Sequence, residues 1–163
     1  MRRVHAGIAL ALVLGASAHA SEQAIALALS PQVINCSVGD SVTLAVTLTN
    51  TTKRPRYLHS DLALTLDYSV KHSSGTVVLP FNDPPQFGRT PEYAAQRIWL
   101  DAGKSIQFTQ RLALTELGIR DAGEFNLVGF WTGDTKTEAQ LKSEDFDVSF
   151  AYSERVKLVV TSR

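Results

Sequence analysis

Residues Asp121 to Trp131 read DAGEFNLVGFW and place a glycine-containing segment directly before a run of large apolar residues. Phe125, Leu127 and Trp131 lie two and four positions apart in the sequence. In a β-strand they therefore share one face, because successive side chains point to opposite faces. Gly123 permits the chain to bend just before this run. The stretch thus predicts a loop that turns sharply into a half-buried strand.

A period of two continues through most of the chain. SVTLAVTLTN from Ser41 to Asn50 alternates aliphatic residues with threonines, and SIQFTQRLAL alternates likewise, with Gln110 as the one polar residue on its apolar face. Turn-forming segments such as 72–75 and 100–105 separate the runs. No stretch sustains a helical period, so we expect an all-β, antiparallel two-sheet Ig-like sandwich of about eight or nine strands. The expected strands are residues 24–29, 32–37, 41–49, 60–70, 75–80, 96–100, 105–114, 124–131 and 154–161, with short helical turns near 92–96 and 137–142.

A family resemblance rests on the opening stretch and three further segments. Four residues fall on the fixed positions of the pattern D-x-G-x-Y-x-C, which marks the crossing before strand F in immunoglobulin-type sandwiches: Asp121, Gly123, Phe125 and Leu127. Together with VGDSVTLAVTLTN, LDAGKSIQF and RVKLVV, they make the chain resemble secreted bacterial Ig-like or fibronectin-III-like β-sandwich proteins. The resemblance implies the architecture and almost nothing about a ligand. Phe125 replaces the tyrosine and Leu127 the cysteine, so the corner hydroxyl bond and the inter-sheet disulfide of antibody domains are absent.

The first twenty residues have the form of a cleavable signal peptide. Arg2 and Arg3 precede the apolar run AGIALALVLGA, which is shorter than a membrane-spanning helix needs, and AHA at 18–20 fits the small-x-small cleavage site. A retained membrane anchor is the alternative interpretation. We expect cleavage after Ala20, a single domain over residues 21–163, no membrane anchor afterwards, and a periplasmic or secreted location.

Charge and cysteine content exclude several partners and crosslinks. The leader contains two of the 16 basic residues and none of the 16 acidic ones, so residues 21–163 carry a net charge near −2. Nucleic acids and anionic membranes both require a basic excess, so neither is expected as a partner. Cys36 is the only cysteine and therefore forms no intrachain disulfide. We expect it to be a small buried residue in a strand.

The sequence contains no motif that requires an enzyme. His59, Ser60 and Asp61 have the residue types of a hydrolase triad, but neighbouring residues of a strand point to opposite faces. The acidic segment SEDFD at 143–147 lacks the glycine-containing spacing of an EF-hand loop. We therefore predict no catalytic residues, no cofactor-binding residues and no metal-binding residues.

Two long connections could carry recognition. The first, FNDPPQFGRTPEYAAQ, covers residues 81–96 and combines prolines, which lower the ordering cost of binding, with aromatic and arginine anchors. Its candidate binding residues are Pro84, Pro85, Phe87, Arg89 and Tyr93. The alternative is that Phe81, Phe87 and Tyr93 fold back to cap the open end of the core. For the second connection, 132–150, a hairpin extension is favoured over a recognition site.

The functional expectation is a non-enzymatic interaction module that presents loops or an exposed sheet edge to a protein or carbohydrate partner. The alternative is a proteinase inhibitor of β-sandwich type that inserts loops 50–56 and 81–96 into a protease cleft. An inhibitor should have rigid loops at one end of the sandwich, whereas an edge binder should expose an uncapped, weakly charged strand. An enzyme with scattered residues is a more distant third hypothesis.

Overall fold

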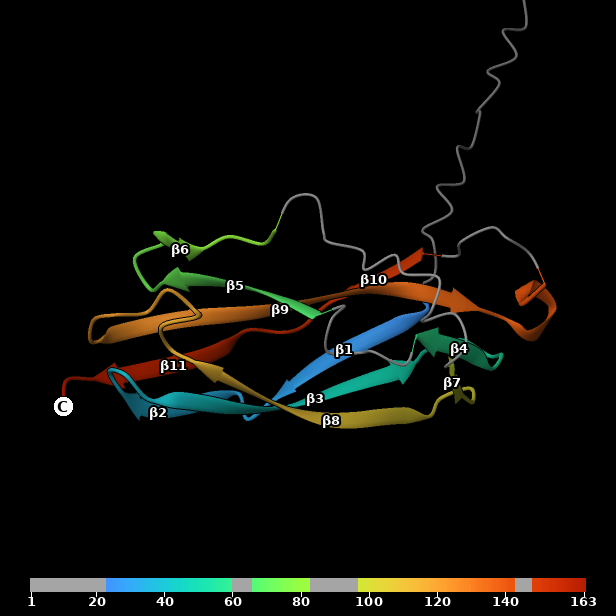
Figure 1. Cartoon of the computed structure of the whole chain (residues 1–163), viewed down its shortest axis with the longest axis horizontal. Helices are drawn as coiled ribbons and strands as arrows, with labels where there is room; N and C mark the ends of the chain where they lie inside the picture. Colours follow the sequence, from blue (N-terminus) through green and yellow to red (C-terminus); the bar gives the residue numbers. More distant parts are fainter. Residues whose placement is uncertain (1–22, 60–65, 83–96, 143–147) are drawn as a thin grey trace, which may run out of the picture.

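A computed structural model describes residues 23–59, 66–82, 97–142 and 148–163 of the chain (Figure 1). The strands in these residues are β1 (Ile25–Ser30), β2 (Val33–Ser37), β3 (Ser41–Asn50), β4 (Arg56–His59), β5 (Leu66–His72), β6 (Val77–Leu79), β7 (Arg97–Leu100), β8 (Ser105–Ala113), β9 (Gly123–Lys136), β10 (Val148–Tyr152) and β11 (Val156–Thr161). The short 3-10 helix η2 (Glu138–Gln140) falls within the helical turn expected at 137–142. No helix in the described part of the chain is long and apolar enough to cross a membrane.

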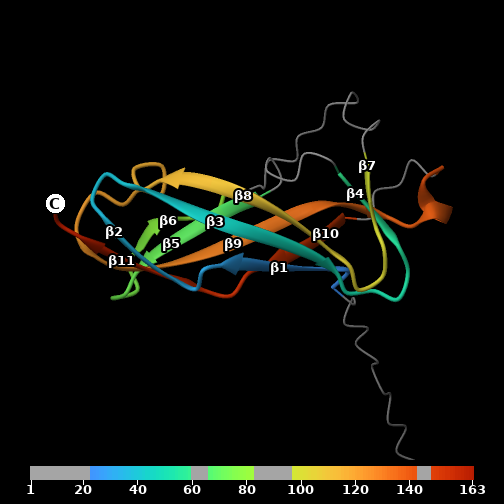
Figure 2. The ribbon, with the colours of Figure 1, turned by 90° about the horizontal axis from the view of Figure 1, so that it is seen from below.

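The strands form two sheets, which confirms the all-β sandwich. A three-stranded sheet has the order β1-β3-β8. The larger sheet contains β2, β11, β9, β5 and β6; β4 and β10 also pair with β9, and β7 pairs with β4. Strands of both sheets run near the long axis of the molecule (Figures 1 and 2). With β1, β3 and β8 as strands A, B and E, and β5, β9 and β11 as C, F and G, the division between sheets is that of an Ig-like domain.

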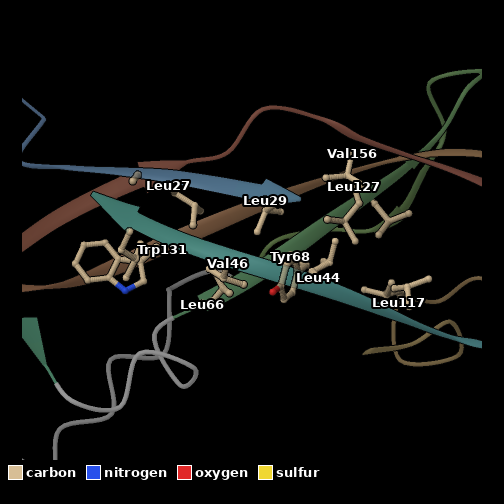
Figure 3. Packing of buried hydrophobic residues seen from close by; sticks show 14 of the residues in the cluster. Leu27, Leu29, Leu44, Val46, Leu66, Tyr68, Leu117, Leu127, Trp131 and Val156 are labelled. Atoms are coloured by element: carbon tan, nitrogen blue, oxygen red, sulfur yellow. The ribbon is translucent and has the colours of Figure 1, made fainter. Parts of the chain in front are cut away.

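The opening stretch of the sequence becomes β9, the longest strand and the centre of the larger sheet. Phe125, Leu127 and Trp131 point inward and are buried, as predicted. Figure 3 shows Trp131 and Leu127 in the core with Leu27 and Leu29 of β1 and Val46 of β3. The alternate residues of β9 lie on the outer face of the larger sheet.

The first strand of the sandwich is divided between the two sheets. β1 pairs antiparallel with β3, whereas β2 pairs parallel with β11, from Lys157 opposite Val33 to Thr161 opposite Ser37. At the crossing, the side-chain amide of Gln32 donates to the carbonyl of Leu29 (2.8 Å), and the carbonyl of Gln32 accepts from the N–H of Lys157 (2.8 Å). The N-terminal segment therefore connects both sheets.

Three of the expected strand assignments need correction, and eight or nine strands was too low a number. β4 lies before the expected strand 60–70, whose described portion is β5; residues 60–65 lie outside the described part. β9 continues to Lys136 instead of ending at 131, and β10 is an additional strand. β4 and β10 have only four and five residues, so their local pattern is weak; β4 is stabilised by pairing with the distant β7, and β10 by pairing with the preceding strand β9. The hairpin extension expected for 132–150 is confirmed by the pairing of β10 with β9.

Candidate functional site

The five residues of the candidate binding loop, Pro84, Pro85, Phe87, Arg89 and Tyr93, lie outside the described residues, so their role stays a prediction. The structure does describe the first two residues of this loop. Asn82 is held to β5, because its N–H and its side-chain amide donate to the two carboxylate oxygens of Asp67 at 2.7 and 3.1 Å. The loop therefore begins from a fixed point on the larger sheet.

Phe81 lies on the outer face of the larger sheet. Its ring contacts the rings of Phe130 and Tyr152 edge-to-face, at centroid distances of 5.7 and 5.8 Å. Phe130 alternates along β9 with the inward-pointing residues, so it faces away from the core. The interpretation in which Phe81 caps the open end of the core is therefore wrong for this residue.

An apolar patch continues from these rings onto β10. Tyr152 pairs opposite Phe130 with ring centroids 4.7 Å apart, and Phe150 and Val148 follow Tyr152 on the same face of the strand. Val148, Phe150 and Tyr152 are 44%, 57% and 58% exposed. We call this surface the β10 patch; it consists of the exposed Val148, Phe150 and Tyr152 together with the half-buried Phe81 and the buried Phe130. Exposed apolar side chains gathered in this way are typical of interaction surfaces.

The edge of β10 that faces away from β9 forms no strand ladder within the described residues, although the start of β1 lies close to it. Among the described strands, β10 pairs with β9 alone. The N–H of Ser153 donates to the carbonyl of Gly129 (2.9 Å), so the hydrogen-bonded positions of this ladder are 153, 151 and 149. The backbone N–H and C=O groups of Val148, Phe150 and Tyr152 therefore point outward. One of them has a side-chain partner, because the amide of Gln23 donates to the carbonyl of Phe150 at 3.2 Å.

A β-bulge at Ser153 and the short reach of β2 leave this edge without a strand partner among the described residues. Between Tyr152 and Val156 the chain has one more residue than its partner strand has between Phe130 and Leu127. The Ser153 hydroxyl fills the gap, accepting from the N–H of Gly129 (2.8 Å) and donating to the carbonyl of Glu154 (2.7 Å). β2 covers β11 beyond the bulge and does not extend along β10.

The residues of this edge were missed as site residues at the sequence level, although VSFAY carries a signal. Its large apolar residues alternate, and none of its five residues is charged. Alternation alone suggests that the large side chains face the core. The structure has the opposite orientation, since Ala151 is buried and Phe150 is exposed.

The turn at 50–56, which belongs to the inhibitor hypothesis, is organised around one buried side chain. Asn50 is fully buried. Its amide donates to the carbonyls of Arg54 and Leu100, both at 2.9 Å, and its side-chain oxygen accepts from the N–H (3.0 Å) and the hydroxyl (2.8 Å) of Thr52. Lys53 and Arg54 remain exposed. This turn is thus an ordered support for two basic side chains.

The described residues present no evident site for covalent or metal chemistry. In the described ranges no three His, Cys, Asp or Glu side chains gather as a metal site would require. The triad types at 59–61 cannot be assessed, because Ser60 and Asp61 and the side chain of His59 lie outside the description. Cys36 is half-buried at the edge of the core, where burial and then the nearby Asp40 charge raise the pKa of its thiol.

No family model matches the chain, and no curated protein matches it. Among solved structures, the chain is similar to the ASH / PapD-like domain of human CEP192 (PapD-like domain 7), with 12% sequence identity and a TM-score of 0.39. The likeness covers 97% of this chain and 98% of that domain. At this TM-score the likeness carries no argument, and the assignment as an Ig-like sandwich rests on the strand pairings described above.

Proposed function

We propose that this protein is a non-enzymatic binding domain, periplasmic or secreted and of the bacterial type that its sequence resembles, which holds an extended segment of a partner protein along β10. One observation carries the proposal: an uncharged strand edge points its free backbone groups outward while its exposed side chains are apolar. These are the features expected above of an edge-strand binder.

A partner backbone is the ligand that best matches this edge. An added strand would form main-chain hydrogen bonds with Val148, Phe150 and Tyr152, while its alternate side chains contact the aromatic rings on the outer face. Tyr and Phe in such a cluster make effective anchors, because they bury large areas with few rotatable bonds. The exposed bond from Gln23 to the Phe150 carbonyl would be exchanged for a backbone bond.

The test uses residues 21–163 and a display library of random peptides of about seven to nine residues, which matches a strand's usual length. We expect enriched peptides to alternate apolar residues and to carry few charges. Phe150→Ala removes the ring alone, whereas Phe150→Pro also removes an outward N–H without touching the ladder to β9. Binding should weaken in the alanine variant and weaken further in the proline variant. Tyr152→Lys, which retains every backbone donor but charges the edge, is the substitute if the proline variant does not fold.

Val77→Lys is the matched control, because Val77 is 50% exposed at the start of β6, away from β10. Its binding should equal that of the unmodified protein. Enriched peptides without alternation, or equal affinity in all the β10 variants, would contradict the proposal.

The inhibitor hypothesis remains the second candidate, supported by the ordered turn around Asn50 and its exposed basic residues. The support is weaker, because the carbonyl of Arg54 already accepts from Asn50 and from the hydroxyl of Thr52 (2.7 Å), and this turn is tight instead of extended. A trypsin-like protease is the appropriate probe for exposed Lys53 and Arg54. If the protein inhibited this protease and Lys53→Ala or Arg54→Ala abolished the inhibition, the inhibitor hypothesis would replace the edge proposal.

A further inference from the structure

Two turns of the chain are joined at the end of the molecule that carries β4 and β7 (Figure 1). The N–H of Asn50 donates to the carbonyl of Lys104, and the N–H of Gly103 donates to the carbonyl of Asn50, both at 3.0 Å. The Asn50 amide adds the bonds to Arg54 and Leu100 described above. The turns at 50–55 and 101–104 are consequently fixed to each other through one residue.

The two joined turns carry three basic side chains on a protein whose formal net charge is zero. Lys53, Arg54 and Lys104 are all exposed. None of the three forms an ion pair with another residue in the described part of the chain, unlike Lys157, which pairs with Glu124, and Arg163, which pairs with Asp40. Their charges are therefore available to an anionic ligand.

An exposed aromatic ring with a fixed orientation lies on β7, two residues before the turn at 101–104. Trp99 on β7 is 41% exposed. Its indole N–H donates to the carboxylate of Asp101 at 2.7 Å, and the ring of Tyr57 meets it edge-to-face with centroids 4.5 Å apart. Because the only polar atom of the indole is already bonded, the exposed part of the ring can offer only its apolar surface to a ligand.

We propose that this surface, formed by Lys53, Arg54, Lys104 and Trp99, binds an anionic polysaccharide whose sugar rings carry carboxylates. The flat C–H face of a pyranose fits an exposed indole, and ring carboxylates fit the neighbouring ammonium and guanidinium groups. The fixed turns keep these groups in place before binding, which reduces the ordering cost. An acidic peptide would use the charges but has no sugar ring to stack. The site lies apart from β10 and does not depend on the proposed peptide binding.

The experiment measures the affinity of residues 21–163 for polygalacturonate by calorimetry, with neutral dextran and poly-glutamate as comparison polymers. We expect polygalacturonate to bind most tightly of the three polymers. Its affinity should fall as the salt concentration rises from about 0.02 M to about 0.15 M, because exposed charges are screened. The triple variant Lys53→Gln, Arg54→Gln, Lys104→Gln should weaken binding at least about tenfold. Trp99→Leu should reduce the preference for polygalacturonate over poly-glutamate.

The matched control removes three exposed charges elsewhere: Lys71→Gln, Arg111→Gln and Lys142→Gln. It should change the affinity by less than about twofold, although its net charge equals that of the first triple variant. If both triple variants lost the same affinity for polygalacturonate, the binding would depend on overall charge alone, and the proposal would be overturned. Poly-glutamate binding as tight as polygalacturonate binding would overturn it as well, and loss of binding in Phe150→Pro would transfer the ligand to β10.

Discussion

The hydroxyl of Tyr68 donates a hydrogen bond of 2.5 Å to the side-chain oxygen of Gln110 across the interior of the sandwich. Tyr68 belongs to β5 in the larger sheet and Gln110 to β8 in the smaller one. Gln110 is the polar residue that interrupts the apolar face of its strand in the sequence. Its partner on the opposite sheet explains why a polar group is tolerated there, since a buried polar group needs a hydrogen bond.

Removal of Gln110 should destabilise the domain by about 1–3 kcal/mol, because the Tyr68 hydroxyl stays buried without a bond. Removal of the Tyr68 hydroxyl should cost less, because Gln110 is only half-buried. The variants are Tyr68→Phe and Gln110→Leu. The double variant leaves no unpaired group and should lose less stability than the sum of the two single variants. Urea denaturation of all four proteins checks this. Strict additivity would show that the bond does not couple the two sheets.

Stability should fall at alkaline pH because of Tyr68. Burial raises the pKa of its hydroxyl well above the ordinary value near 10. The unfolded chain therefore loses the proton first, and the stabilisation, complete below about pH 10, decreases above it by up to about 1.4 kcal/mol per pH unit. Tyr68→Phe should lose less stability between pH 9 and pH 11 than the unmodified protein. Identical pH dependence of the free energy of unfolding would show that Tyr68 ionises normally.

Phe125→Ala should destabilise by about 3–5 kcal/mol, because the ring is buried where β9 enters the core. Phe150→Ala on the exposed β10 patch serves as the control and should stay within about 1 kcal/mol. Chemical denaturation measures both. A loss below about 1 kcal/mol for Phe125→Ala would mean that this residue does not fill the corner of the core.

Gly133→Ala should destabilise by about 1–3 kcal/mol or more through overpacking. A methyl group on Gly133 would lie 2.5 Å from a ring carbon of Trp131, which is itself fully buried and cannot move aside. Gly129→Ala is a milder comparison, since its methyl group would meet the end of the Leu29 side chain at 3.0 Å. The melting temperature of Gly133→Ala should be lower than that of Gly129→Ala. The reverse order would place the Trp131 ring elsewhere.

Asn50→Ala should destabilise by about 2–3 kcal/mol, because it leaves the carbonyl of Leu100 buried without its partner and releases the turn at 50–54. Asn35→Ala, at an exposed position of β2, should be nearly neutral. Denaturation of both variants gives the comparison. Faster amide hydrogen exchange at Gly103 and Lys104 in Asn50→Ala would confirm that the two turns depend on this residue.

The sequence predicted those parts of the fold whose signal is local. β3, β8 and the first half of β9 alternate over nine or more residues or follow a distinctive turn, and the tight turn at Gly75, with φ +95°, requires a glycine. β4 was not predicted, because RYLH becomes a strand only by pairing with β7 and the end of β9.

The candidate site was less accessible to prediction. The edge of β10 lacks a strand partner among the described residues because of a bulge and because β2 ends short of it, and both features depend on pairing with distant strands. The Asn50 junction likewise depends on contacts between residues 50 and 104, far apart in the chain. An edge-strand binder was among the hypotheses, but the strand itself could not be identified from VSFAY, whose large residues face away from the core.

The division of the first strand between the two sheets also affects how the domain responds to tension. The start of β1 and the end of β11 lie toward opposite ends of the long axis (Figure 1). A pull between them would slide β1 along β3 and β2 along β11. Six paired positions in the first ladder and five in the second would then share the load simultaneously instead of opening one by one. The same crossing should therefore make the domain mechanically resistant to a pull along its long axis.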